Sequence, residues 1–480
     1  MAKNITSPEK DFSRWYLDVI REAELADSAP VRGCMIIRPY GYAIWENMKA
    51  SLDRRFKETG HSNAYFPLFI PQSFITRESE HVEGFAPELA IVTHGGGKEL
   101  EEPLAVRPTS ETIINHMFSK WINSYRDLPM LLNQWANVVR WEKRTRPFLR
   151  TTEFLWQEGH TAHADEEDAR RETMKMLGVY ESFAVDDAAI PVIPGLKTEG
   201  EKFAGAVDTY AIEAMMRNGW ALQSGTSHYL GTNFARAFDT KFLDSENVQQ
   251  YVHQTSWGVS TRLVGALIMA HGDKNGLRLP PRLAPVQTVI VPIFRSDEDR
   301  QRVMEKASNI RDSLEKAGVR VKMDDSQGVS PGFKFNHWEV RGVPLRLELG
   351  PRDLEEEHVM ASPRNKPGRE GKFTIPMNGL VDEVKKKLEE IQNQMLGDAT
   401  DYRDSHTYEI QEYRQLVEQL PEKPGFYRVW WDGGAEEEAR MQEETKATVR
   451  CIPLAQSGGS GKCFMTGRET DRQAIVARAY

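Results

Sequence analysis

One short stretch of the chain carries the side chains with the clearest chemistry. Arg140 and Glu142 stand two residues apart, and Arg150 and Phe154 follow after a basic turn. On a strand, residues at i and i+2 point the same way, so the arginine and the glutamate would lie side by side. The guanidinium would bind a phosphate or carboxylate, and the carboxylate would accept a hydrogen bond from an exocyclic amine. This layout predicts a nucleotide held by base and phosphates; the alternative is an exposed basic hairpin.

Two further segments place polar residues at the start of an apolar helix. Thr109 and Glu111 open a helix expected to reach Phe118, and Arg262 directly precedes the apolar run Leu263–Ala270. For Thr109 the simpler reading is an N-cap, worth about 1 kcal/mol. That reading does not suit Arg262, because the positive end of a helix dipole disfavours a cation. An arginine at this position fits a site where an anion binds at the helix start.

Length and charge limit the class of protein. A chain of 480 residues is long enough for roughly two to four domains, each with its own core. The net charge of −9 means that any nucleic-acid contact must come from local basic patches. Three cysteines do not make a disulfide framework, and we find neither an apolar leader segment nor a run long enough to span a bilayer. We therefore expect a cytosolic protein without membrane contact.

The elements that must position these residues mix helix and strand. Tyr42–Gly60 is expected to be a helix. The apolar run Asn63–Pro71 contains prolines, which cannot donate to a strand ladder, so we expect it at a sheet edge. Such an edge suits a dimer surface, unless a loop of the same chain covers it. Trp220–Gly231 is expected to form a strand on which Thr226 and His228 share a face.

Two smaller domains are expected after the Gly- and Pro-rich linker His271–Pro285. The first alternates short strands and helices, beginning with the strand Thr288–Ile293 and a helix capped by Ser296. A domain boundary is expected at Gly397–Ser405, before a last small domain. The predicted fold class is α+β, with three domains at residues 1–283, 284–396 and 397–480.

In this order and spacing, the segments resemble the three signature motifs of class II aminoacyl-tRNA synthetases, and in detail the archaeal and eukaryotic type of the prolyl-tRNA synthetase family. The matching segments are Asn63–Pro71 for motif 1, Arg140–His160 for motif 2 and Gly258–Arg262 for motif 3. Arg107–Glu111 resembles the Thr-x-Glu loop of that family, and residues 286–362 resemble its anticodon-binding domain. Because the end at Tyr480 is also similar, the resemblance covers nearly the whole chain.

The resemblance implies a catalytic domain built on an antiparallel sheet flanked by helices, an α/β anticodon-binding domain and a small α+β C-terminal domain. It implies that L-proline reacts with ATP, brought as a Mg²⁺ complex, to prolyl-adenylate, and that the prolyl group passes to the 3′ end of tRNA(Pro). It also implies a homodimer formed through motif 1. Glu348 and Arg364 are candidate anticodon contacts, unless they are ordinary solvated residues.

The family's residue roles carry over onto matching positions. Arg140, Glu142 and Arg262 would be the catalytic groups. Arg140 would contact both the α-phosphate and the proline carboxylate. Glu142 would contact the adenine amine, and Arg262 the γ-phosphate. The other nucleotide-binding residues would be Arg150, Thr151, Phe154, Gln223, Thr226 and Ser260. The proline-binding residues, besides Arg140, would be Thr109, Glu111, Trp156, Glu158, Phe203 and His228.

Two features found in some relatives are not expected here. An editing domain between motifs 2 and 3 is not expected, because pocket segments take up the interval Ala164–Thr255. A structural zinc bound by four cysteines is not expected either. Only Cys463 falls on a ligand position, and Asp432, Glu437 and Thr466 stand at the other three. Threonine is a poor zinc ligand, so we predict a zinc-free domain and no metal site.

Two other interpretations remain open from the sequence. The chain could be another class IIa enzyme, specific for threonine, glycine or histidine, or a catalytically silent paralogue that binds or regulates. Thr109 with Glu111 and the run Trp156–Glu158 favour proline. A silent paralogue would be expected to lack the three catalytic groups, all of which are present.

Overall fold

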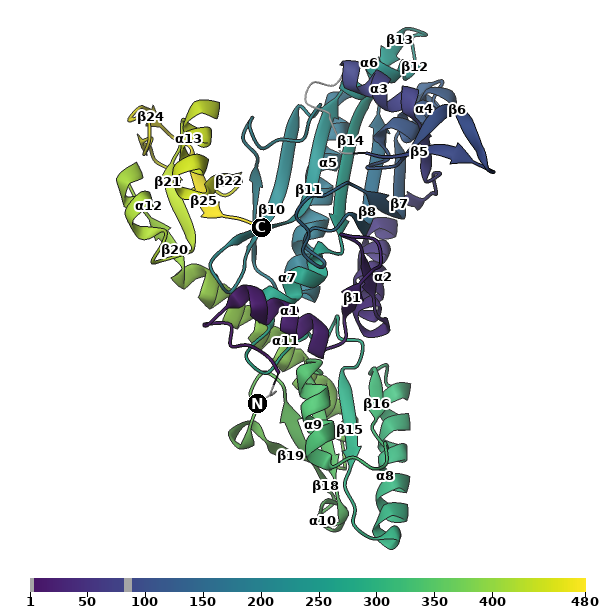
Figure 1. Ribbon diagram of the computed structural model, residues 1–480, viewed down its shortest axis with the longest axis vertical. Coiled ribbons are helices and arrows are strands. Elements are labelled where there is room, and N and C mark those ends of the chain that lie inside the picture. Colours follow the sequence, from purple (N-terminus) through teal and green to yellow (C-terminus); the bar gives the residue numbers. More distant parts are fainter. Residues whose placement is uncertain (1–3, 82–88) are drawn as a thin grey trace.

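The computed structural model describes residues 4–81 and 89–480 (Figure 1). Within this part, eleven strands form one large sheet in the order β20-β21-β25-β22-β9-β10-β11-β14-β8-β7-β3. The long central strands pair antiparallel, whereas β3 pairs with β7 in parallel. The strand bounds are Ser62–Asn63 (β3), Met130–Val139 (β7), Glu153–His163 (β8), Val192–Leu196 (β9), Asp208–Met215 (β10), Ala221–Gly231 (β11), His253–Ser260 (β14), Thr407–Glu409 (β20), Phe426–Trp430 (β21), Ala447–Pro453 (β22) and Gln473–Arg478 (β25).

Helices cover one face of this sheet and share the main hydrophobic core with it. Helix α5 (Glu166–Ser182) lies across β8, β10, β11 and β14, and α1 (Phe12–Glu22), α2 (Pro39–Glu58) and α7 (Arg262–His271) pack around it. Trp257 lies in this core with Tyr180. A Cβ atom at Gly159 would lie 2.0 Å from the Trp257 ring, so a glycine is required in the middle of β8.

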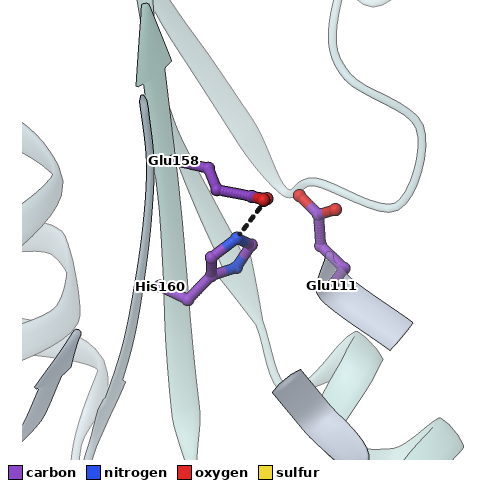
Figure 2. A group of neighbouring side chains, drawn as sticks. All are labelled: Glu111, Glu158 and His160. Carbon is purple, nitrogen blue, oxygen red and sulfur yellow. Dashed lines mark hydrogen bonds and ion pairs between the residues drawn. The ribbon is translucent and has the colours of Figure 1, made fainter. Parts of the chain in front are cut away.

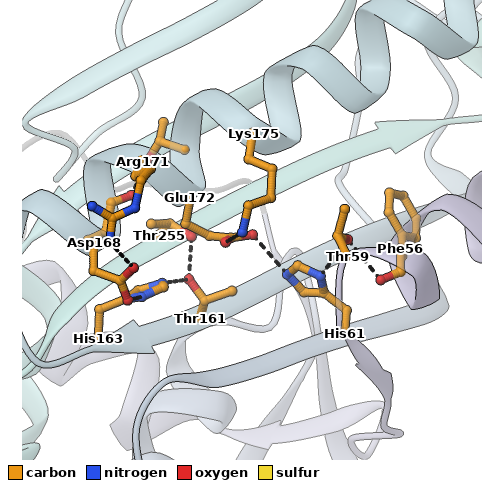
Figure 3. Close-up of polar contacts among 12 residues, drawn as sticks. Phe56, Thr59, His61, Thr161, His163, Asp168, Arg171, Glu172, Lys175 and Thr255 are labelled. Carbon is orange, nitrogen blue, oxygen red and sulfur yellow. Dashed lines mark hydrogen bonds and ion pairs between the residues drawn. The ribbon is translucent and has the colours of Figure 1, made fainter.

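Polar side chains also lie on the helix-covered face, and they bind one another (Figure 3). His163 on β8 contacts Asp168 through Nδ1 at 2.6 Å and Thr161 through Nε2 at 2.7 Å. His61, which follows α2, lies 3.1 Å from a carboxylate oxygen of Glu172 on α5. This face therefore combines tight apolar packing with paired polar groups, as buried polar groups require.

The apolar run with prolines lies at the outer edge, as expected. It is divided into β3, the last strand of the large sheet, and β4 (Phe69–Pro71), which joins β6 and β5 in a smaller sheet. The other elements of the N-terminal part are β1 (Ala26–Ser28), β2 (Met35–Ile37), α3 (Gln72–His81), β5 (Ala90–Gly95), β6 (Lys98–Val106), α4 (Glu111–Trp121), η1 (Tyr125–Asp127), η2 (Phe183–Asp187), α6 (Asn233–Phe238), β12 (Lys241–Leu243) and β13 (Gln249–Tyr251).

A five-stranded sheet in the order β16-β15-β17-β18-β19 builds the next part, which has its own core. The expected alternation of strands and helices is confirmed, and Ser296 caps α8 by accepting from the Asp299 amide at 3.1 Å. Arg364 does not face solvent, because it forms a bidentate pair with Asp273 at 2.7 and 2.8 Å. The bounds are Thr288–Pro292 (β15), Asp297–Lys316 (α8), Val321–Met323 (β16), Pro331–Val340 (α9), Leu345–Leu349 (β17), Pro351–Glu355 (α10), His358–Pro363 (β18), Arg369–Gly371 (η3) and Phe373–Pro376 (β19).

The segment Gly397–Ser405, where a domain boundary is expected, is helical. A single helix, α11 (Leu380–Ser405), runs through this segment and connects the five-stranded part to the last part (Figure 1). A glycine inside a helix costs about 1 kcal/mol, which the packing of Leu388 and Met395 on buried surfaces outweighs. The domain limits themselves remain a prediction. None of the described helices is both long and apolar enough to cross a membrane.

The last part of the chain extends the large sheet. Strand β22 pairs with β9, bringing Ile452 opposite Leu196, so the sheet continues from the catalytic part without interruption. The elements not yet given are α12 (Tyr413–Gln419), α13 (Ala435–Thr445), β23 (Gly461–Lys462) and β24 (Glu469–Thr470).

Candidate active site

A cavity of about 360 Å³ opens on the face of the large sheet that α5 does not cover. Its wall brings together residues that are far apart in the sequence, from 109 to 263. Twelve of the fifteen predicted site residues line it: Thr109, Glu111, Arg140, Phe154, Trp156, Glu158, Phe203, Gln223, Thr226, His228, Ser260 and Arg262.

Strand register explains how these residues meet. Alternate residues of β8 face the cavity, and β14 places Gly258 opposite Glu158 and Ser256 opposite His160. On its other side β14 places Ser256 opposite His228 of β11. Polar residues of three neighbouring strands therefore form one row along the cavity. Thr226 and His228 both line the cavity, so the prediction that they share a face is confirmed.

One end of the cavity is acidic. Figure 2 shows Glu158 and His160 side by side on β8, with Glu111 facing them from the start of α4. One ligand atom of each lies within 4.8 Å of the others, and all three residues are buried. Glu158 accepts from the Ser110 hydroxyl at 2.5 Å and from Gln134 Nε2 at 3.0 Å, as well as contacting His160 at 2.9 Å. With its oxygens already bound, Glu158 suits a cationic ligand that adds one more donor better than a metal ion that needs free lone pairs.

The charges of this group depend on one another. Burial alone would raise the pKa of Glu158, but the hydrogen bond and positive charge of His160 outweigh burial and lower it. Burial would likewise lower the pKa of His160, but Glu158 and Glu111 outweigh that and raise it. Glu158 and His160 thus favour each other's charged form, and Glu111 adds to the effect on His160.

The other end of the cavity is basic. Arg140 lies over the rings of Phe154 and Trp156, at 5.5 and 5.4 Å, and donates to the Pro108 carbonyl at 3.1 Å. Burial, and next the charge of Arg140, lower the pKa of Arg262 to about 10. Two half-buried guanidiniums that repel each other form a site for an anion, as the position of Arg262 at the helix start predicts.

The wall between the two ends is aromatic. The rings of Phe203 and His228 lie 4.7 Å apart, and burial lowers the pKa of His228 to about 3, so this imidazole is neutral. Thr209 holds both residues, because its hydroxyl contacts His228 Nδ1 at 2.9 Å and accepts from the Phe203 amide at 2.9 Å.

Three predicted residues do not line the cavity. The strand expected to carry both Arg140 and Glu142 ends at Val139, so the prediction that they lie side by side on a strand is wrong. The chain turns there because the β7–β8 pairing stops at Val139 and Glu153. Glu142 instead meets Arg150 at 2.7 Å.

Thr151, the third, donates to the Glu153 carbonyl at 2.7 Å. That Glu142, Arg150 and Thr151 bind a nucleotide stays a prediction.

Sequence reasoning missed several cavity residues. His160 was recognisable, because strand alternation places it on the same face as Glu158. Glu201 had no such signal, since the loop between β9 and β10 has no periodicity, and Thr209 lies at the very start of β10. Ser256 and Gly258 lie on β14, next to the predicted Ser260.

The four positions that match zinc ligands in some relatives lie in the last part of the chain. Asp432 pairs with Arg468 at 2.7 Å, and Glu437 accepts from the backbone at the start of its own helix at 2.8 Å. Burial would raise the pKa of Cys463, but hydrogen bonds from Thr466 and neighbouring amides lower it. The oxygen ligands are therefore already engaged by protein donors, which does not fit a zinc site.

Comparisons with known proteins agree with this geometry. The class II tRNA synthetase core domain (G, H, P, S and T) matches residues 92–271, the anticodon-binding domain 287–387 and the prolyl-tRNA synthetase C-terminal domain 413–480.

Whole proteins match as well. A proline–tRNA ligase of Roseiflexus sp. (strain RS-1) is 56% identical, with 100% of this chain and 99% of that protein aligned. A chloroplastic/mitochondrial proline–tRNA ligase of Arabidopsis thaliana is also 56% identical, over 99% of this chain and 88% of that protein. The crystal structure of prolyl-tRNA synthetase from Cryptosporidium parvum, complexed with halofuginone and AMPPNP, superimposes with a TM-score of 0.94 at 40% identity and 99% coverage of both chains. The chain belongs to the proline–tRNA ligases, a family of class II aminoacyl-tRNA synthetases.

Proposed function

We propose that this protein is an ATP-dependent proline–tRNA ligase that joins L-proline to tRNA(Pro) in the cavity described above. The observation that carries this proposal is the polarity of the cavity, which has buried carboxylates at one end and half-buried guanidiniums at the other. An amino acid has an ammonium and a carboxylate, and ATP adds phosphates to the carboxylate side. The full-length relatives named above support the same activity.

Proline binds at the acidic end. Glu111 is the counter-charge of the secondary ammonium, and Thr109, which donates to Glu111, keeps that carboxylate turned toward the ligand. Trp156, Phe203 and neutral His228 surround the pyrrolidine ring. Glu158 holds the start of α4 in place through Ser110.

ATP binds at the basic end as its Mg²⁺ complex, which supplies charge neutralisation of the phosphates. Arg140 contacts both the proline carboxylate and the α-phosphate, because a guanidinium donates through several N–H groups at once. Arg262 binds the γ-phosphate, and Phe154 stacks on the adenine. The remaining nucleotide contacts come from Gln223, Thr226, Ser260, Glu142, Arg150 and Thr151.

Glu142 and Arg150 reach the nucleotide when their mutual ion pair opens. The Arg150 side chain of this pair is 63% exposed, so breaking the ion pair costs little free energy. Glu142 then accepts from the adenine amine, and Arg150 binds the triphosphate.

The reaction has two steps, and neither requires a protein nucleophile. The proline carboxylate attacks the α-phosphorus of ATP, a P–O bond forms and pyrophosphate leaves, giving prolyl-adenylate. A ribose hydroxyl of the terminal adenosine of tRNA then attacks the activated carbonyl, and AMP leaves. Arg140 stabilises the charge that develops in the first step, and the cavity aligns the reactants in both.

The test is ATP–pyrophosphate exchange with a panel of amino acids. We expect exchange with proline and weak exchange with alanine, because one or two methylenes contribute only about 1–3 kcal/mol of discrimination. Exchange driven by threonine, glycine or histidine would assign the chain to another class IIa specificity. A complete lack of exchange would identify a silent paralogue.

We further propose that the enzyme lacks an editing activity. The interval from Ala164 to Thr255 consists of α5, the cavity strands β9–β11 and the short elements up to β13. Robust hydrolysis of alanyl-tRNA(Pro) by the purified protein would contradict this.

A homodimer in the cytosol without structural zinc completes the proposal. Strand β3 lies at the outer edge of the sheet, and beside it Tyr65 and Phe69 are exposed at 73% and 47%. Such aromatic surface favours a subunit contact. Sedimentation of Tyr65→Asp should show more monomer than the parent protein, and elemental analysis after a chelator wash should find no stoichiometric zinc.

A further inference from the structure

The loop between β9 and β10, residues 197–207, joins the proline end of the cavity to the last part of the chain. Glu201 and Phe203 of this loop line the cavity. The other side of the loop faces α13 and β22, which belong to the C-terminal part. The loop therefore lies between the proline end of the cavity and the C-terminal part, which contributes no residue to the cavity lining.

A first set of contacts fixes the start of the loop through buried charges. Lys197, 1% exposed at its side chain, donates to the Arg450 carbonyl at 2.6 Å and to Glu213 at 3.3 Å. Arg450 in turn forms a bidentate pair with Glu213, at 3.1 and 3.2 Å. The carboxylate of Glu201 lies 3.7 Å from Lys197 and 3.8 Å from Arg450. Two cations and two anions balance one another, which is the condition for burying them.

A second contact fixes the next turn. The hydroxyl of Thr198 donates to Glu438 on α13 at 3.0 Å. A Cβ atom at Gly200 would lie 2.9 Å from the same carboxylate, so the loop backbone passes directly against Glu438. Burial raises the pKa of Glu438, as expected for a carboxylate covered by the loop.

We propose, on the basis of the proline specificity proposed above, that Arg450 and Glu438 are positioning residues of the proline site. They hold the 197–207 loop so that Phe203 stays against His228 and closes the ring pocket. The C-terminal domain thereby determines how tightly the cavity encloses a five-membered ring, although it contributes no side chain to the cavity lining. The charges of Glu213 and Arg450 also act on Arg262, so the contact of Thr198 with Glu438 is the one whose loss should leave nucleotide binding unchanged.

The variants weaken the two sets of contacts separately. Thr198→Val keeps the shape of the side chain and deletes the hydrogen bond to Glu438. Arg450→Met removes the charged link at similar volume, and Arg428→Met, on β21 of the same domain and away from the loop, is the matched control. Should Arg450→Met fail to fold because Glu213 loses a partner, the double variant Glu213→Gln/Arg450→Met removes both charges together.

The measurement is ATP–pyrophosphate exchange with each substrate varied in turn. We expect the KM for proline to rise about fivefold in Thr198→Val and about tenfold in Arg450→Met or the double variant. The KM for ATP should stay within about twofold in Thr198→Val, and the preference for proline over alanine should fall. Arg428→Met should behave as the parent protein does.

Hydrogen exchange of the peptide covering residues 197–207 provides a readout other than activity. It should accelerate in Thr198→Val and Arg450→Met and remain unchanged in Arg428→Met. An equal rise in the KM values for ATP and proline in Thr198→Val, or unchanged KM values with unchanged exchange of the loop, would overturn the inference. If the parent protein does not activate proline at all, the proposed function fails instead, which is a separate result.

Discussion

The two faces of strand β8 carry similar side chains but complete their hydrogen bonds differently. On the cavity face, Glu158 and His160 line the cavity together with Glu111 (Figure 2). On the helix-covered face, Thr161 and His163 are bound by protein partners (Figure 3). Histidine and an acidic partner therefore occur on both faces of one strand, and the surrounding space decides which pair serves a ligand.

The two histidines also differ in charge. Carboxylates raise the pKa of His160 against the effect of burial, whereas burial lowers the pKa of His163 despite Asp168. Each histidine feels a second carboxylate, Glu111 for His160 and Glu172 for His163, but the charge of Lys175 also acts on His163 and lowers its pKa. The balance of burial and neighbouring charges therefore sets the direction of each shift.

The largest effect is expected on the cavity face. Glu111→Gln removes the counter-charge of the proline ammonium without changing the shape of the side chain. A hydrogen bond to a charged group contributes about 1.5–3 kcal/mol, so kcat/KM for proline should fall about 10- to 100-fold. Pyrophosphate exchange measures this, and the KM for ATP should change little. Comparable losses for both substrates would argue that the variant is misfolded or that proline binds elsewhere.

A substitution on the helix-covered face should affect stability instead. His61→Leu leaves one oxygen of buried Glu172 without the imidazole 3.1 Å away. We expect the free energy of unfolding to fall by about 1–3 kcal/mol, measured by urea denaturation. The exchange rate with proline should stay within about twofold at a temperature where the variant is folded. If His61→Leu lost activity but not stability, the proposed division into a ligand-binding face and a structural face would be wrong.

The opposite pKa shifts predict opposite pH effects on stability. Since the pKa of His160 is raised, its contribution is fully present below the ordinary value of about 6.5 and is lost as pH rises through the folded-state pKa. Since that of His163 is lowered, its contribution is present above about 6.5 and is lost as pH falls through the folded-state pKa. The measurement is the urea midpoint as a function of pH. In His160→Gln the midpoint should therefore fall less on the alkaline side, and in His163→Gln it should fall less on the acidic side. Identical profiles for the two variants would contradict the assignment of charge.

The smallest effect on stability is expected at the rim. The pair between Arg150 and Glu142 is partly exposed, and such pairs contribute about 0–1 kcal/mol. Arg150→Ala should therefore leave the urea midpoint nearly unchanged. If Arg150 leaves Glu142 to bind the triphosphate, the KM for ATP should nevertheless rise several-fold. An unchanged KM would remove Arg150 from the nucleotide site.

The sequence predicted most of what depends on local periodicity. Alternation along Trp220–Gly231, the cap at Ser296 and the prolines of the edge segment all led to elements that the structure contains. The cation before α7 was informative because it conflicts with the helix dipole, a conflict that occurs where a ligand supplies the opposite charge.

Expectations that depended on where an element stops were less successful. The end of β7 at Val139 is set by its pairing with β8, which no local signal reveals. The expected boundary at Gly397–Ser405 gave no indication that α11 runs through it, because the packing of the helix outweighs the low helix propensity of Gly397. The contacts of the 197–207 loop with Glu438 and Arg450 join residues about 250 positions apart and could not be predicted from spacing.

The pairing of β9 with β22 also has a consequence for how the protein is made. Strand β9 emerges from the ribosome early, but the partner that covers its edge is synthesised more than 250 residues later. Until then one edge of β9 is unpaired in the growing chain, beside an incomplete substrate pocket. Such an edge can pair with strands of other chains. Folding during synthesis therefore cannot finish with the first domain, and a nascent chain stalled before β22 is where we expect chaperones to be needed.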